Sequence, residues 1–157
     1  MLKSLFNPDS IAVIGASKTK GKVGYEILYN LVNNGYQGKI IPVNPKAEEI
    51  CGIKVLKTLN EYKEKIDLSV IVIPAQYVKA AVQDSVKAGV KAVIVISAGF
   101  KEIDQDGAAK EKEIAELCRM NNVRLLGPNC LGAINSQFNM NASFAVRMPK
   151  NGNISVI

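Results

Sequence analysis

The sequence predicts an α/β domain with a doubly wound, mostly parallel sheet, and three observations lead to this prediction. Short runs of Val and Ile alternate with segments whose apolar residues recur at helical spacing. The runs at 67–73 and 92–96 are too apolar to expose one face to water, as expected for strands covered by helices on both sides. A length of 157 residues suits one domain, and 48% hydrophobic with 22% charged residues is typical of globular proteins.

The expected strands and helices alternate along the chain, which is the order of a parallel sheet with crossover helices. In chain order we expect strand 10–15, helix 23–33, strand 39–43, strand 67–73, helix 75–88, strand 92–96, helix 108–121 and strand 123–126. Pro42 predicts an edge position for its strand. Asp106–Gly107 is the expected start of the third helix, and Gly35 and Gly89 fall where the first two helices should end.

Each predicted helix has one apolar face that can pack on the sheet. These faces consist of Val23, Ile27, Leu28 and Leu31 in the first helix, Val78, Ala81, Val82 and Val86 in the second, and Ile114, Leu117 and Cys118 in the third.

The last residues have a pattern of their own. Residues 151–153 (NGN) predict a turn, and 154–157 (ISVI) predict the beginning of another strand. We expect residues 1–150 to form the domain and 151–157 to start a following domain that is absent from this chain. The alternative is that this strand pairs with the sheet of the same domain.

Composition narrows the possible partners. The net charge of +6, from 20 basic and 14 acidic residues, suits an anionic partner, although a lysine-rich surface explains it equally well. Dispersed lysines and an aromatic content of 6% without Trp argue against nucleic acid. No apolar run reaches the roughly 18 residues of a membrane span, so we expect no membrane partner. Three cysteines without a CxxC pair favour a cytoplasmic location.

The chain contains no histidine. This removes the commonest general base and the commonest metal ligand, so we expect binding rather than catalysis, with no catalytic residue and no metal site. Cys130 follows Gly–Pro–Asn in a loop and could be a nucleophile, but a packed, inert thiol is the favoured interpretation because no base is evident nearby.

Loops after the predicted strands form the candidate site, since open α/β sheets bind ligands at the carboxyl ends of their strands. Loop 15–24 follows a strand and opens a helix, which suits a phosphate, but it matches neither GxGxxG nor GxxxxGK[ST]. A glycine-containing turn without a ligand is the alternative. In loop 44–46, Lys46 stands where NAD enzymes carry an acid. Lys46 would suit a phosphorylated ribose, as in NADP or coenzyme A. The alternatives are that Lys46 is a solvated loop residue, or that Glu48 or Glu49 supplies the acid a few residues later in the sequence.

The loops after the third and fourth strands carry small residues. The segments 74–75 (PA) and 97–99 (SAG) leave room for a flat group such as adenine or for an extended chain. Ser97 could donate a hydrogen bond to a ligand, or it could be a cap or turn residue.

Six stretches together resemble a known family. They are NPDSIAVIGAS (7–17), GKVGYEILYNLVNNGYQGKIIPVNPK (21–46), IDLSVIVIPA (66–75), GVKAVIVISAGFKE (89–102), RLLGPNCLGAIN (124–135) and MNASFAVRMPKNGNISVI (140–157). The sequence resembles the Rossmann-like CoA-binding domain of ADP-forming (NDP-forming) acyl-CoA synthetases, such as acetyl-CoA synthetase, which are relatives of the succinyl-CoA synthetase α subunit.

The resemblance implies a role for each matching loop. It places Gly15, Ser17, Lys22, Val23 and Gly24 at the pyrophosphate, and Asn44, Pro45 and Lys46 at the 3′-phosphate and ribose. It places Ile73, Pro74 and Ala75 along the adenine or pantetheine path, and Ser97, Ala98, Gly99 and Asn129 beside the pantetheine arm.

In this family, acyl-CoA, ADP and phosphate interconvert with acid, CoA and ATP. The resemblance implies a phosphorylated histidine in a following domain and an ATP-grasp module for ATP or ADP and Mg²⁺, both absent here. We therefore expect this chain to bind CoA without turnover, with other domains or a subunit of the same synthetase as partners. The alternatives are an NAD(P)-binding regulatory or oxidoreductase domain, a CoA-sensing domain of a fused protein acetyltransferase, and an interaction domain whose site has decayed.

Overall fold

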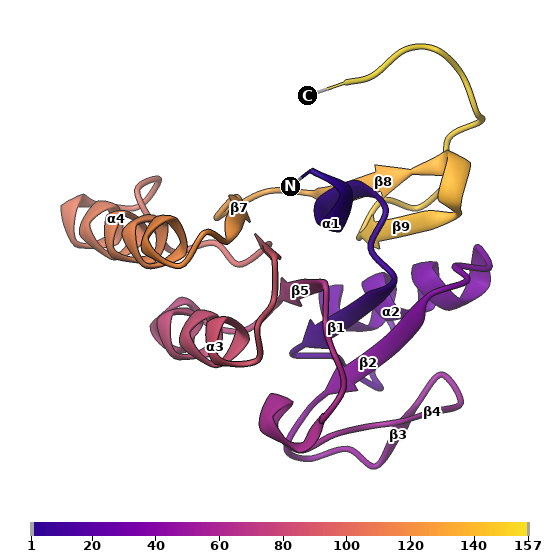
Figure 1. The fold of residues 1–157 in the computed structure, drawn as a ribbon, viewed down its shortest axis with the longest axis horizontal. Coiled ribbons are helices and arrows are strands. Elements are labelled where there is room, and N and C mark those ends of the chain that lie inside the picture. Colours follow the sequence, from indigo (N-terminus) through magenta and orange to yellow (C-terminus); the bar gives the residue numbers. More distant parts are fainter. Residues whose placement is uncertain (1, 157) are drawn as a thin grey trace.

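A computed structural model describes residues 2–156 and shows a five-stranded parallel sheet with helices on both faces (Figure 1). The sheet has the order β2-β1-β5-β6-β7, and every neighbouring pair is parallel. Its strands are β1 (Ser10–Ile14), β2 (Lys39–Val43), β5 (Leu68–Ile71), β6 (Ala92–Val95) and β7 (Arg124–Leu126). The predicted fold class is confirmed.

The remaining elements are helices, short turns and two hairpins. The helices are α1 (Lys3–Phe6), α2 (Val23–Asn33), α3 (Ala75–Lys87) and α4 (Gln105–Met120), with 3₁₀ turns η1 (Leu59–Glu61) and η2 (Ser136–Phe138). The antiparallel hairpins pair β3 (Glu49–Ile50) with β4 (Ile53–Lys54) and β8 (Gly132–Asn135) with β9 (Met140–Ser143).

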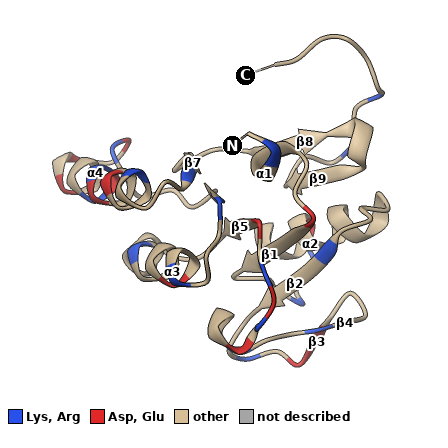
Figure 2. Cartoon of the chain, viewed as in Figure 1, with Lys and Arg blue, Asp and Glu red and all other residues tan. Residues whose placement is uncertain are grey.

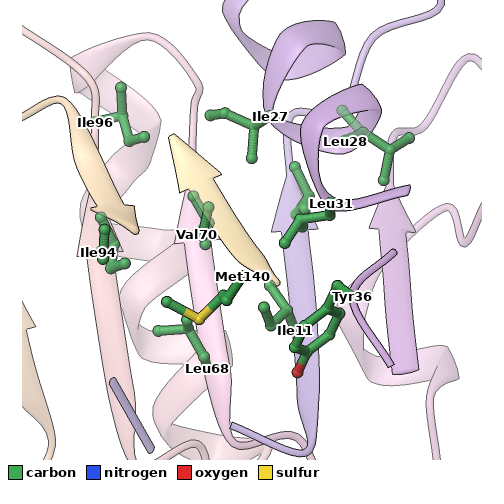
Figure 3. Close-up of a cluster of buried hydrophobic side chains, with 14 of the residues drawn as sticks. Ile11, Ile27, Leu28, Leu31, Tyr36, Leu68, Val70, Ile94, Ile96 and Met140 are labelled. Carbon is green, nitrogen blue, oxygen red and sulfur yellow. The ribbon is translucent and has the colours of Figure 1, made fainter. Parts of the chain in front are cut away.

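Two apolar layers hold the sheet in place. Successive strand residues point to opposite faces, and both faces are buried. Figure 3 shows one layer, where Ile27 and Leu31 of α2 and Met140 of β9 pack over strand residues such as Leu68 and Val70. The opposite layer lies under α3 and α4 and consists of strand residues such as Ile71 and Val93 with Val78, Val82, Ile114 and Cys118 from the helices.

The predicted ends of α2 and α3 are confirmed. Gly35 and Gly89 follow the last helical residues with φ of +73° and +77°, a left-handed conformation that glycine adopts without strain. The predicted start of α4 is wrong. Asp104, not Asp106, caps this helix by accepting a hydrogen bond from Gly107 N at 2.7 Å, so Gly107 lies inside the first turn.

The edge position predicted for β2 is confirmed, with an addition that the sequence did not reveal. Residues 55–56 run beside β2 in the parallel direction and partly cover its outer edge. Asn44 N donates to Leu56 O at 2.9 Å, and Leu56 N donates to Pro42 O at 3.0 Å. The segment that follows Leu56 therefore begins at the same edge of the sheet as the loop after β2.

The strand predicted at 154–157 does not form in its described residues, 154–156. Ile154 and Val156 are 90% and 94% exposed.

Lys and Arg are distributed over helices, strands and loops, interspersed with Asp and Glu (Figure 2). Within residues 2–156, no helix has the length and apolar character needed to cross a membrane.

Candidate functional site

The predicted loops after β1, β2, β5, β6 and β7 lie along the carboxyl edge of the sheet; they are 15–24, 44–46, 74–75, 97–99 and 127–130. From β1 the chain passes through α2 to β2 on one side, whereas β5 lies on the other side of β1, so the connections diverge between β1 and β5. Gly15 follows β1 at this point with φ of +93°. A Cβ on Gly15 would lie 2.2 Å from the carbonyl oxygen of Val72, so no larger residue fits here without movement of the backbone.

Gly24 brings the start of α2 close to the end of β1. It is buried in the first turn of the helix, and a Cβ on it would lie 2.1 Å from Gly15 O. Gly24 therefore has a packing role that exists without any ligand. Substitution here would displace the helix from the strand.

The first loop presents backbone N–H groups and a helix N-terminus. Helix α2 begins after Lys22, whose side chain makes no capping hydrogen bond. Within the loop, Ser17 Oγ accepts from Thr19 N at 3.1 Å, and Gly21 N donates to Glu26 Oε1 at 2.9 Å. The loop is thus ordered partly by a carboxylate from the first turn of α2.

Four exposed lysines belong to the loops after β1 and β2. Lys18, Lys20 and Lys22 belong to the first loop, and Lys46 belongs to the loop after β2. Among residues 2–156, none of the four forms an ion pair. Together with the positive end of the α2 dipole, they make this edge of the sheet favourable for an anion.

Asn44 joins the first two loops. Its Nδ2 donates to Ala16 O at 2.7 Å, and its Oδ1 accepts from Lys46 N at 2.7 Å. Both polar atoms of the Asn44 side chain are therefore used by the protein itself. The side chain fixes the backbone of Lys46 relative to the end of β1.

Ser97 joins the loops after β5 and β6. Its hydroxyl donates to Ile73 O at 2.5 Å and accepts from Ile73 N at 3.1 Å. Asn129 N, in the loop after β7, donates to Ser97 O at 3.0 Å. These bonds order three neighbouring loops and give Ser97 a structural role. Of the two roles considered from the sequence, ligand contact or a cap or turn residue, this one is nearer to the second.

Gly99 and Ala75 lie where the loop after β6 meets the start of α3. A Cβ on Gly99 would be 2.9 Å from Ala75 Cβ, and φ of Gly99 is +105°. Gly99 N donates to Glu102 Oε1 at 2.6 Å, and this backbone hydrogen bond helps to lower the pKa of the Glu102 carboxyl below its usual value.

Two pockets lie at the carboxyl edge. The pocket on the α3 side has a volume of about 300 Å³ and is lined by Ile14, Gly15, Val43, Pro45, Lys57, Thr58, Leu59, Ile73, Pro74, Tyr77, Ala81 and Asp84. We call it the β2-side pocket. The pocket on the α2 side has a volume of about 480 Å³ and is lined by Val23, Val72, Ile96, Ser97, Ala98, Asn129, Cys130, Leu131 and Phe144. We call it the hairpin-side pocket, because Phe144 directly follows β9.

The sequence-predicted residues divide between these pockets and their rim. Gly15, Pro45, Ile73 and Pro74 line the β2-side pocket, whereas Val23, Ser97, Ala98 and Asn129 line the hairpin-side pocket. The other predicted residues belong to the same loops or to the first turns of the helices that follow them, but line neither pocket: Ser17, Lys22, Gly24, Asn44, Lys46, Ala75 and Gly99.

Sequence reasoning missed Lys57, Leu59 and Tyr77 in one pocket and Leu131 and Phe144 in the other. Leu131 lies at the end of the loop after β7, and the other four lie outside the loops that directly follow predicted strands. Tyr77 is 56% exposed in the first turn of α3. The signal available in the sequence was an aromatic residue at the start of a helix that directly follows one of the predicted site loops.

Cys130 is a poor nucleophile in this setting. Its Sγ donates to Val95 O at 3.4 Å, and burial raises the pKa of the thiol above its usual value. Burial also raises the pKa of Cys118, to about 11. Among the described residues, no group of three or more metal-ligating side chains comes together.

Comparisons with known proteins match most of the chain. The family model described as CoA binding domain matches residues 9–136. The chain is 45% identical over 156 residues to an ADP-forming acetate–CoA ligase of Methanocaldococcus jannaschii, covering 99% of this chain and 22% of that protein. It is 42% identical to the α subunit of ADP-forming acetate–CoA ligase II of Pyrococcus furiosus, covering all of this chain and 34% of that subunit.

A solved structure with the same fold is the dinucleotide-forming acetyl-coenzyme A synthetase 1 of Candidatus Korarchaeum cryptofilum, in complex with phosphate and ADP. It matches with a TM-score of 0.92 and 38% identity, over 98% of this chain and 32% of that chain. The chain thus spans between a fifth and about a third of the length of these relatives. The match to the family model covers most of the chain and includes the loops after β1, β2, β5, β6 and β7, so the chain belongs to the CoA binding domain family.

Proposed function

We propose that this chain binds coenzyme A along the carboxyl edge of its sheet, with the adenosine end in the β2-side pocket and the pantetheine arm in the hairpin-side pocket. The observation that carries this proposal is the position of the Gly15 loop, next to an apolar pocket on one face of the sheet and close to a second pocket on the other. CoA has a base at one end, a flexible arm at the other and a diphosphate between them.

The β2-side pocket suits a purine. Its lining is largely apolar, with Pro45, Pro74 and Tyr77 as flat or rigid surfaces. A flat heteroaromatic base gains from burial against such side chains. Lys46, fixed through its backbone to Asn44, would lie beside the ribose 3′-phosphate.

The diphosphate would lie over loop 15–24. The uncapped start of α2 supplies N–H groups and the positive end of a helix dipole, and Lys18, Lys20 and Lys22 supply charge. Glu26 opposes this arrangement, because its carboxylate already accepts from Gly21 N. Binding of the diphosphate would therefore displace Glu26 from this N–H group.

The pantetheine arm would extend through the hairpin-side pocket. Val23, Ile96, Leu131 and Phe144 offer apolar contacts. The backbone of Ala98 and the side-chain amide of Asn129, whose backbone N–H already donates to Ser97 O, would meet the amides of the arm. The Ser97 hydroxyl is already committed to Ile73, so we assign it to ordering the loop rather than to direct ligand contact.

We further propose that the chain is the CoA-binding part of an ADP-forming acid–CoA ligase. Its support is the identity of 38–45% to ADP-forming ligases over nearly the whole chain. The chain contains no histidine, so a phosphorylated histidine would come from another part of the ligase, as would the groups that bind ATP and Mg²⁺. Residues 1–150 would form the CoA domain, and 151–157 would lead toward a further domain.

A thermal-shift titration with CoA, 3′-dephospho-CoA, NADH and NADP⁺ tests the proposal. A ligand at about 100 times its Kd adds about 2.7 kcal/mol to the free energy of unfolding. For a chain of this size, that corresponds to an increase in Tm of about 5–10 °C. We expect CoA to produce this increase and dephospho-CoA a smaller one. An increase with NADH or NADP⁺ alone would contradict the proposal.

A further inference from the structure

Lys57 lies at the carboxyl edge of the sheet, although it does not belong to a loop that follows one of the predicted strands. It directly follows Leu56, which pairs with Val43 in the parallel direction. Lys57 therefore occupies the position that a loop residue after a sixth strand would occupy, next to the loop after β2. Its Nζ donates to Ala47 O at 3.0 Å, which holds the ammonium beside the residue that follows Lys46.

The ammonium of Lys57 is available to an anion. An ammonium group has three donors, and one of them is used by Ala47 O. Within residues 2–156, Lys57 forms no ion pair. The nearby carboxylate of Glu61 is committed to backbone N–H groups, since it accepts from Lys57 N at 3.3 Å and from Thr58 N at 3.2 Å.

Lys57 is also the one cation among the residues that line the β2-side pocket. The one acidic lining residue, Asp84, lies 3.6 Å from Lys87 Nζ in an ion pair, which offsets its charge. If the base packs against Leu59 and Tyr77, its ribose would therefore lie next to Lys57, the one positive side chain of the lining.

We propose that Lys57 binds the 3′-phosphate of the adenosine moiety together with Lys46, and that it is a determinant of the preference for CoA over 3′-dephospho-CoA. This inference rests on the proposed function and deepens it. It assigns recognition of the phosphate to a residue outside the loop after β2. An ammonium preset by its bond to Ala47 O loses less conformational freedom on binding than the exposed side chain of Lys46.

Calorimetric titration of the whole chain with CoA and with 3′-dephospho-CoA tests the role of Lys57. We expect Lys57→Gln to weaken CoA binding roughly tenfold, equivalent to about 1.4 kcal/mol, and to change dephospho-CoA binding less than twofold. Lys57→Arg, which keeps the charge, should retain most of the preference for CoA. Thermal unfolding of the free variants should match wild type, because the side chain is exposed.

Lys63→Gln is the matched control. Lys63 Nζ makes the same type of bond, to Asn60 O at 2.9 Å, but Lys63 does not line the pocket. We expect wild-type affinity for both ligands in this variant. Wild-type CoA binding in Lys57→Gln, or equal weakening of both ligands, would overturn the role of Lys57 while leaving the proposed function standing. A wild-type chain that binds neither ligand would overturn the proposed function and this inference together.

Discussion

Replacement of Gly24 by Ala tests how closely α2 must approach the end of β1. The new Cβ would lie 2.1 Å from Gly15 O, whereas ordinary contact begins at 3.4 Å, so the first turn must retreat by about 1.3 Å. Overpacking of this kind costs about 1–3 kcal/mol, and the upper part of that range applies because the obstacle is backbone. The higher helix propensity of Ala returns about 1 kcal/mol. We therefore expect a net loss of about 2 kcal/mol, or a Tm lower by about 4–8 °C.

Urea unfolding and calorimetric titration with CoA measure the two consequences of Gly24→Ala. Because the displaced turn carries the proposed diphosphate site, CoA affinity should fall together with the free energy of unfolding. Gly152→Ala is the control, since a Cβ there meets nothing within 4 Å. We expect this control to match wild type within about 0.5 kcal/mol. A Gly24→Ala variant as stable as the control would refute the close approach of helix and strand.

Three further changes probe individual interactions. Ser97→Ala removes two hydrogen bonds to the backbone after β5 and should lower the free energy of unfolding by about 1–3 kcal/mol in urea titrations, with no change expected if these bonds are absent. Burial alone raises the pKa of the Asp67 carboxyl, but hydrogen bonds from Lys65 and from the backbone N–H of Asp9 outweigh burial, and the net effect lowers this pKa. The ionised carboxylate therefore stabilises the fold near neutral pH, and this stabilisation is lost as the pH falls through the lowered pKa. Unfolding free energies measured from pH 7 to pH 2 should therefore decline less steeply in Asp67→Asn than in wild type, and parallel profiles would contradict this. Glu26→Gln removes a negative charge from Gly21 N and should strengthen CoA binding about two- to fivefold in calorimetry; weaker binding would show that the carboxylate supports the site.

The main strands and helices were predictable from the sequence, because the strands are short continuous apolar runs and each helix buries one apolar face at helical spacing. The structure places α2 at 23–33 and β2 at 39–43, as the sequence predicts. Gly35 marks the end of α2 because its left-handed conformation ends the helical hydrogen-bond pattern. The start of α4 was misplaced because two Asp residues precede Gly107, and only the structure shows that Asp104 accepts its N–H.

The hairpins were not predictable from local patterns. The strands β3 and β4 have two residues each, too few for a recognisable alternation. Strand β9 contains Asn141 and Ser143, which a polarity pattern assigns to solvent although both are buried. Hydrogen bonds offset part of the cost of their burial, since Asn30 Nδ2 of α2 donates to Ser143 O at 2.9 Å and Ser143 Oγ donates to Asn141 Oδ1 at 2.6 Å, whereas Asn141 Nδ2 has no partner among the described residues.

The candidate site was predictable as a set of loops but not as pockets. Carboxyl ends of parallel strands meet at one edge, and this rule brought together the loops that contain Gly15, Lys46 and Ser97. The rule says nothing about segments that approach the edge from elsewhere. Lys57 and Phe144 reach the two pockets through residues 55–57 and the β8–β9 hairpin, whose positions depend on tertiary contacts.

Amide chemical-shift mapping of the isotopically labelled chain during CoA titration tests most directly where CoA binds. We expect the largest changes in loop 15–24, around Lys46 and Lys57, and near Ala98. A pocket of about 380 Å³ lined by Asn7, Tyr36, Gln137 and other residues serves as the internal comparison. Small changes around this comparison pocket and large ones at the carboxyl edge would support CoA binding at the carboxyl edge. Changes concentrated at the comparison pocket would contradict binding there.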